Sequence, residues 1–241
     1  PAGNTDAEIL ENLQVKTPMP LNSVLDKLFY QQRCFQNNES VETLTYETLK
    51  SIAEDNIKLI ELRFSPGFMA APKSLSLDAI MEGVLTAKER AERDFDIAIG
   101  YLLISSRDLG LDMCEETIDL AIRWKKEILG IDLAGAEEDF PPELFEKPFL
   151  KAHKAGLAIT VHSGEVSDPI HVMTSIEKLK ARRIGHGVQS IKNKHVVSQL
   201  KKLNVPLELC PTSNVMTMAV PTLQAHPLKN LMEEGVAVTL N

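Results

Sequence analysis

One segment of the sequence places an imidazole and a carboxylate close together at the end of a buried strand. His162-Ser163-Gly164-Glu165 directly follows the apolar run 157–161. A neutral imidazole is a common zinc ligand, and a carboxyl group in a partly apolar mouth can act as a general acid. A core histidine whose ring nitrogens are hydrogen-bonded within the protein, beside a surface glutamate, would give the same four residues. This segment alone therefore leaves a catalytic and a structural interpretation open.

A second histidine, His186, stands between two glycines in the segment 184–187. Little side-chain bulk surrounds it, which suits close approach by a substrate or a metal, although a glycine-rich strand end is also a common packing feature. Two successive strands that both end in histidine would bring both imidazoles to one mouth of a parallel sheet. Together, the two segments favour a metal-assisted hydrolytic site.

Weaker signals come from other parts of the chain. Gly135 ends an apolar run and could present its backbone N–H to a ring nitrogen of a flat ligand, but an ordinary turn glycine is the alternative. The polar segments 210–214 and 226–228 could bind substrate or cap loops. Near the start of the chain, one apolar helix face has core packing as its default interpretation. That face consists of Leu21, Val24, Leu25 and Leu28.

The elements that must position these residues alternate regularly after residue 56. Short, nearly continuous apolar runs are typical of strands buried on both faces. Amphipathic segments with a spacing near 3.6 separate most of them, which predicts a parallel sheet with right-handed crossovers. The expected strands lie within residues 57–64, 95–104, 128–135, 157–164, 182–188, 205–210 and 236–241.

Polar residues follow the ends of several strands, as catalytic groups do at the C-terminal face of a TIM-type (β/α)8 barrel. An open doubly wound sheet is the alternative, but such a sheet typically carries a glycine-rich phosphate-binding loop after an early strand, and the sequence has none. We expect one α/β barrel domain over residues 1–241, with a helical segment at 1–56 and strands two to eight within 57–241. The barrel would lack its first strand and end at the eighth. The polar residues are Arg63, Arg107, Asp132, His162, His186 and Asn214.

Composition narrows the class of partner. The formal net charge is −8, with acidic and basic residues interspersed, which disfavours nucleic acid and anionic membranes and suits a small molecule. The three cysteines show no CxxC spacing, which favours reduced thiols and a cytoplasmic protein. No apolar run approaches the roughly 20 residues that span a bilayer.

Taken in order, six segments resemble the purine-nucleoside deaminases of the metal-dependent amidohydrolase superfamily, and the adenosine deaminase family most closely. The resemblance covers residues 20–241. It implies hydrolytic deamination of adenosine and 2′-deoxyadenosine to inosine and 2′-deoxyinosine, with release of ammonia, at a site that holds one zinc ion. The segments are ELRFSP, IDLAG, TVHSGE, RIGHGV, CPTSN and HPL.

The resemblance also implies a role for individual residues. His162 would be a zinc ligand, and Glu165 would donate a proton to the purine ring. His186 would steady the attacking water and help take its proton. Gly135 would donate its backbone N–H to another ring nitrogen. The apolar face that would cover the ribose end of the pocket comprises Leu21, Val24, Leu25 and Leu28.

The sequence departs from the family pattern at its metal site. The family supplies two further ligands from a His-x-His pair and one from a Thr-Asp-Asp run, but no His-x-His occurs here and the chain stops at Asn241. We therefore expect the remaining zinc ligands outside these residues. Ala136 also replaces the aspartate of a frequent Asp-Glu pair. The alternatives are a sister deaminase of adenine, aminofutalosine or a modified purine, and a non-catalytic nucleoside-binding barrel.

Overall fold

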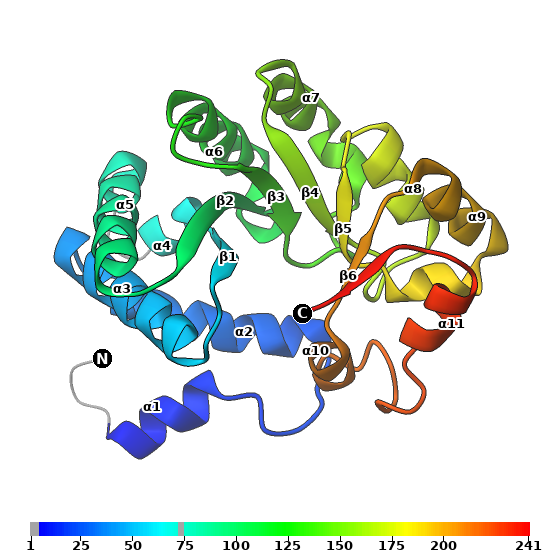
Figure 1. Ribbon diagram of the computed structural model, residues 1–241, viewed down its shortest axis with the longest axis horizontal. Helices are drawn as coiled ribbons and strands as arrows, with labels where there is room; N and C mark the ends of the chain where they lie inside the picture. Colours follow the sequence, from blue (N-terminus) through cyan, green and yellow to red (C-terminus); the bar gives the residue numbers. More distant parts are fainter. Residues whose placement is uncertain (1–4, 72–74) are drawn as a thin grey trace.

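The computed structural model describes residues 5–71 and 75–241. Its strands form one parallel sheet in which each strand pairs with the next along the chain. The sheet curls, and helices follow its outer side (Figure 1). The strands are β1 (Leu59–Phe64), β2 (Ala98–Ser106), β3 (Gly130–Ala134), β4 (Ala158–Ser163), β5 (Arg183–His186), β6 (Leu207–Leu209) and β7 (Val238–Leu240).

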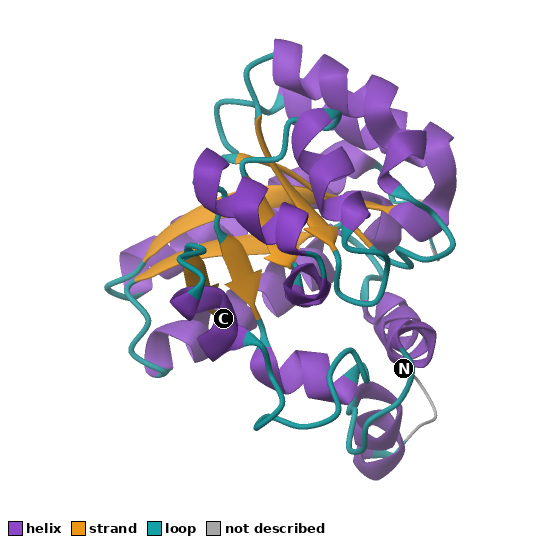
Figure 2. Cartoon of the chain, turned by 90° about the vertical axis from the view of Figure 1, so that its right-hand side faces the viewer, coloured by secondary structure: helices purple, strands orange, loops and turns teal. Residues whose placement is uncertain are grey.

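Helices connect the strands and precede the first of them. Seen from the side, the strands form one curved layer with helices packed around it (Figure 2). Among the described helices, none is long and apolar enough to cross a bilayer. The α-helices are α1 (Asp6–Leu13), α2 (Leu21–Gln31), α3 (Asn38–Glu54), α4 (Pro66–Ala70), α5 (Leu77–Asp94), α6 (Gly110–Arg123), α7 (Glu146–Lys154), α8 (Ile170–Glu177), α9 (Lys194–Leu203), α10 (Pro211–Met216) and α11 (Leu228–Glu233). Short 3₁₀ turns are η1 (Gln32–Cys34), η2 (Arg107–Leu109), η3 (Pro142–Phe145) and η4 (Val188–Lys192).

Each of the seven predicted apolar runs overlaps one of these strands, with β2 extending two residues past its run, and all strand pairs are parallel. The prediction is confirmed at the level of a curled, parallel α/β sheet with helices outside it. The predicted apolar helix face near the start of the chain lies on α2.

The register of the strands gives the sheet a polar inner face. Asp132 shares its face with Thr160, because Gly130 pairs with Ala158 and side chains alternate along a strand. His162 pairs with Gly185, which in turn pairs with Glu208, so these positions lie on that same face. Parallel pairing in this register therefore brings charged side chains from separate strands together inside the curl.

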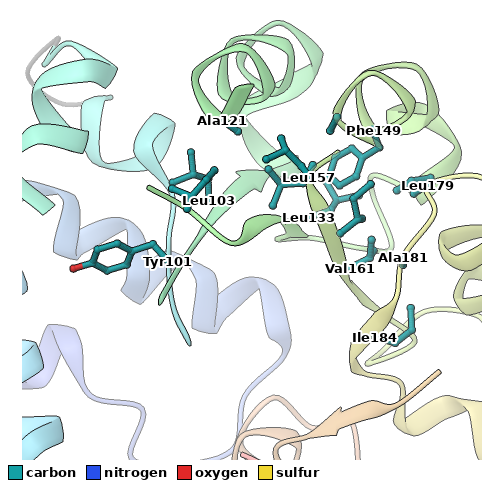
Figure 3. Close-up of a cluster of buried hydrophobic side chains, with 14 of the residues drawn as sticks. Tyr101, Leu103, Ala121, Leu133, Phe149, Leu157, Val161, Leu179, Ala181 and Ile184 are labelled. Carbon is teal, nitrogen blue, oxygen red and sulfur yellow. The ribbon is translucent and has the colours of Figure 1, made fainter. Parts of the chain in front are cut away.

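The outer face of the sheet is apolar and packs against the helices. Leu103, Leu133, Val161 and Ile184 come from successive strands and are fully buried. Figure 3 shows them with Phe149 of α7 in one cluster. Burying side chains of this size stabilises a fold by about 1.5–3 kcal/mol each. The helices are thus held by the outer face, and the inner face is left for polar groups.

The segment before β1 lies near the C-terminal ends of the strands. The Met19 backbone N–H donates to the carbonyl of Met216 in α10, at 2.9 Å. Asn22 Nδ2 lies 3.3 Å from Asp139 Oδ2, in the loop after β3. These contacts hold α2 beside the loops that carry the polar residues.

Candidate active site

The ends of β4 and β5 bring together the three residues that the sequence assigned to chemistry. The imidazole rings of His162 and His186 have centroids 5.2 Å apart. His186 Nε2 lies 3.5 Å from Glu165 Oε2, which is beyond an ordinary hydrogen bond. Glu165 and His186 are both buried. The expected meeting of two imidazoles and a carboxyl at one strand edge is therefore present in the structure.

Backbone geometry explains why glycine precedes His186. A Cβ atom on Gly185 would lie 3.1 Å from Cγ and Nδ1 of the His162 ring, so a side chain there would press on that ring. His186 itself has a φ of 62°, in the left-handed region that costs a non-glycine residue roughly 1–2 kcal/mol. Backbone strain of this kind occurs where the surrounding structure fixes a functional side chain.

His162 is oriented by a buried carboxylate on the neighbouring strand. Its Nδ1 lies 3.0 Å from Asp132 Oδ2, and Asp132 is fully buried. Burial disfavours ionisation of Asp132, but the interactions with His162 and Arg63 outweigh it and hold the pKa of Asp132 well below its usual range. Burial likewise disfavours the imidazolium of His162, but Asp132 raises its pKa above the ordinary value. The contact at Nδ1 leaves Nε2 of His162 as its second nitrogen.

Arg63 ties three strands together on the inner face. Its guanidinium donates to Asp132 Oδ2 at 2.9 Å and to Glu208 Oε2 at 2.5 Å. Burial opposes the charge of Arg63, but the two carboxylates raise the pKa of the group above its ordinary value. The positive charge of Arg63 is therefore matched by two carboxylates within the fold.

The carboxyl of Glu165 is held by the loop and helix that follow β6. Asn214 Nδ2 donates to Glu165 Oε1 at 3.1 Å, and the Thr217 hydroxyl donates to the same oxygen at 2.7 Å. Gln189 Nε2 donates to the backbone carbonyl of Glu165 at 2.8 Å. Burial lowers the pKa of His186, against the opposing attraction of the Glu165 carboxylate. One oxygen of Glu165 is thus saturated with donors, while the other faces His186.

The turn that carries Glu165 closes around another buried carboxylate, that of Glu137. Its two oxygens accept the backbone N–H groups of Gly164 at 2.8 Å, of Ser167 at 3.0 Å and of Val166. Three donors around one carboxylate hold the turn in a single conformation. The fully buried Arg107 adds a bond from its guanidinium to the carbonyl of His162, at 2.8 Å.

His162 fits the role of a metal ligand, because a carboxylate on Nδ1 is the usual support of a histidine that binds metal through Nε2. Within residues 5–71 and 75–241, no three His, Cys, Asp or Glu side chains are grouped so that they could hold a metal ion. A complete metal site therefore needs ligands beyond the described residues.

A cavity of about 430 Å³ lies beside this cluster and adjoins it at Arg63. Leu25, Leu28 and Phe29 of α2 line it together with Gly135, while Leu21 and Val24 are half-buried and do not. His162, Glu165 and His186 are not on its walls. The structure therefore places Gly135 and half of the expected apolar face in one cavity, and the three chemical residues next to it.

Gly135 fits its position only as glycine. Its φ is 113°, and a Cβ atom there would lie 2.1 Å from Oδ2 of Asp108. Asp108 Oδ1 also accepts the backbone N–H of Ala136, at 3.3 Å. Within residues 5–71 and 75–241, Asp108 and Arg63 are the charged residues that line the cavity.

Sequence reasoning gave no role to several residues that position the site. Thr217 follows Asn214 by three residues, a spacing that puts both on one side of a short helix, and this was the available signal. For Glu137 the available signal was weaker: a carboxylate two residues after Gly135, just past the end of a predicted strand. Gln189 lies in η4, and His226 belongs to the segment 226–228, for which the sequence left substrate binding and loop capping open.

A curled parallel sheet with polar groups at the ends of several strands defines the class of the protein, an α/β fold close to the TIM type. The sequence model of the family "Adenosine deaminase" matches residues 1–241. An adenosine deaminase of Klebsiella pneumoniae (strain 342) is 35% identical over 242 residues, an alignment that covers 100% of this chain and 72% of the relative. The chain belongs to the adenosine deaminase family.

Solved structures show the same fold. The adenine deaminase of Arthrobacter aurescens superposes with a TM-score of 0.91 at 28% identity, covering 100% of this chain and 73% of that one. An amidohydrolase of Burkholderia ambifaria with bound Zn gives 0.88 at 23% identity, covering 100% and 67%. The N6-methyl-AMP deaminase of Arabidopsis thaliana gives 0.81 at 23% identity, covering 97% and 69%. Proteins with different purine substrates therefore share this fold.

Proposed function

We propose that this enzyme deaminates adenosine and 2′-deoxyadenosine hydrolytically, with one zinc ion, and releases ammonia. The observation that carries the proposal is the buried carboxyl of Glu165, fixed at one oxygen by Asn214 and Thr217 and directed with the other toward His186. In the reaction, the oxygen of water bonds to carbon 6 of the purine, and the bond from that carbon to the amino nitrogen breaks. An amino group leaves poorly, so an acid must protonate the ring as water adds.

Glu165 has the geometry for this acid. Oε1 already accepts two hydrogen bonds, so the proton that can be transferred lies on Oε2. From there it passes to the ring nitrogen beside carbon 6. The carboxylate that forms keeps both donors on Oε1, which stabilise its negative charge. The arrangement thus favours proton release without a rearrangement of Glu165.

His162 would hold the zinc ion through Nε2, with Asp132 fixing the ring. A bound zinc ion supplies one effect, a lower pKa of the attacking water. We also propose that the other ligands and the first strand of a closed barrel lie on residues beyond 1–241. The coverage of only 72% of the Klebsiella relative supports this extension.

The cavity supports an uncharged nucleoside as the substrate. The purine would lie against Gly135, whose backbone N–H would meet a ring nitrogen, and the sugar against Leu25 and Leu28. The charge of Arg63 is already matched by carboxylates, and Asp108 would repel a phosphate. Among the described residues that line it, the cavity therefore offers no free positive charge to a nucleotide.

The experiment is a substrate panel with the purified protein loaded with zinc. Turnover of adenosine, 2′-deoxyadenosine, adenine, AMP and N6-methyl-AMP is followed by the change in purine absorbance. We expect the two nucleosides to give the highest kcat/KM. A higher kcat/KM for adenine or for either nucleotide would contradict the nucleoside assignment and move the protein to a sister activity.

A further inference from the structure

A chain of hydrogen bonds runs from the start of α11 to the two residues at the reacting centre. It begins at the backbone of Leu228, passes through the side chains of His226 and Asn214, and ends at Glu165 and His186. His226 and Asn214 are buried, and the latter is fully so. The bond at Leu228 has a fixed donor, a backbone N–H, and from it the direction of the other bonds can be worked out.

The far end of the chain is fixed by the backbone. The N–H of Leu228 donates to His226 Nδ1 at 3.1 Å. Because a backbone N–H only donates, Nδ1 of His226 carries no proton, and the proton of this neutral ring is on Nε2. His226 Nε2 lies 3.2 Å from Asn214 Oδ1 and donates to it. This contact orients the amide of Asn214 with its NH₂ group on the opposite side.

The near end agrees with this orientation. Asn214 Nδ2 lies 3.1 Å from Glu165 Oε1 and 3.0 Å from His186 Nδ1, so its two hydrogens have one acceptor each. His186 therefore accepts at Nδ1 and carries its own proton on Nε2, the nitrogen that faces Glu165 Oε2. A flipped amide would set its oxygen against a carboxylate and its NH₂ group against the N–H of His226.

The contact with Glu165 no longer determines the orientation of the Asn214 side-chain amide once Glu165 carries its acid proton. A flipped Asn214 could then accept that proton at Oδ1, and it could also accept a proton from His186 Nδ1. In that state the proton of Glu165 would sit on Oε1, away from the substrate. Only the N–H of His226 opposes the flip, because a buried donor left facing another donor costs about 1–3 kcal/mol.

We infer that His226 is a positioning residue, which acts through Asn214 to keep the Nε2–H tautomer of His186 and the acid proton of Glu165 on Oε2. The catalytic consequence rests on the proposed function; the hydrogen-bond assignment does not. In this tautomer Nε2 of neutral His186 is a donor. His186 therefore steadies the attacking water by donating to its oxygen and does not take its proton at Nε2.

The test is NMR of zinc-free protein with ¹⁵N-labelled histidine, in which long-range ¹H–¹⁵N correlations show which ring nitrogen is protonated. We expect Nε2–H at both His186 and His226 in the wild-type protein. The Glu165→Gln variant removes the near-end constraint, since an amide can donate or accept. It should keep one tautomer at His186. Adding His226→Ala should produce a second signal with the proton on Nδ1, and adding His226→Gln, which restores a donor, should remove it.

The exposed His195 of α9 supplies the control, and Glu165→Gln with His195→Ala should keep one tautomer. A proton on Nδ1 of His186 in the wild-type protein would overturn the inference, even if the double variants failed to fold. A single Nε2–H tautomer in Glu165→Gln/His226→Ala would also overturn it and leave His226 a structural role only. The spectra need no turnover. Failure to deaminate adenosine would therefore contradict the proposed function alone.

Discussion

The buried carboxylate of Glu137 offers a sharp perturbation of the turn that carries Glu165. In Glu137→Gln the amide oxygen can keep the donors Val166 and Ser167 at the position of Oε1, but the NH₂ group then faces the N–H of Gly164. The two retained bonds lose their charge, which weakens each by about 1 kcal/mol, and the unmatched buried donor costs about 1–3 kcal/mol. We expect the free energy of unfolding to fall by about 3–5 kcal/mol.

Thermal and urea unfolding measure this loss. For a chain of this size the melting temperature should drop by roughly 2–4 °C per kcal/mol, or about 6–20 °C in total. kcat should fall as well, because the turn positions Glu165. The neighbouring Glu138 is exposed, so Glu138→Gln has the same change in composition and should stay within about 0.5 kcal/mol of the wild type. Equal melting temperatures for the two variants would refute this account of the turn.

Three further changes follow from individual contacts. His162→Ala should abolish zinc binding in metal analysis while His195→Ala keeps it; unchanged zinc in the first variant would remove His162 from the ligand set. Gly135→Ala adds a Cβ atom 2.1 Å from Asp108 Oδ2, so it should raise KM for adenosine and destabilise the fold. The control is Gly156→Ala, which should destabilise the fold less, because Gly156 has a φ of 86° but no atom lies within 4 Å of the added Cβ. Equal effects of the two glycine variants would show that backbone strain alone matters. Burial raises the pKa of Cys114 to about 11. Alkylation of its thiol should therefore be negligible at pH 8 and rise as the pH approaches 11. Fast labelling of the folded protein at pH 8 would contradict the burial of this side chain.

The residues of the reacting centre could be predicted because two kinds of information coincide. The apolar runs locate the strands, and parallel strands end at one edge, so His162, Glu165 and His186 had to come close. At Gly185 the sequence left open close approach by a substrate or metal and a packing role, and the structure supports packing, because the His162 ring occupies the space that a side chain would need.

The residues that hold the site in position could not be predicted from the sequence, because their contacts depend on how the chain folds. Glu208 lies within a short apolar strand, and only the register shows that it shares the inner face with His162. The partners of Glu165 depend on how the loop after β6 folds back over β4 and β5, which local pattern does not encode. Of the apolar face on α2, Leu21 and Val24 lie outside the cavity because helix position is set by long-range contacts.

The most direct test of the central assignment is the Glu165→Gln variant in steady-state kinetics, with zinc content measured on the same sample. The amide oxygen can take the place of Oε1 and keep the bonds from Asn214 and Thr217, so the variant removes the acid proton with little change in shape. We expect kcat for adenosine to fall by roughly 10²–10⁴-fold or more, with KM and zinc content nearly unchanged. A kcat near that of the wild type would show that Glu165 is not the acid, and loss of zinc would make it a ligand instead.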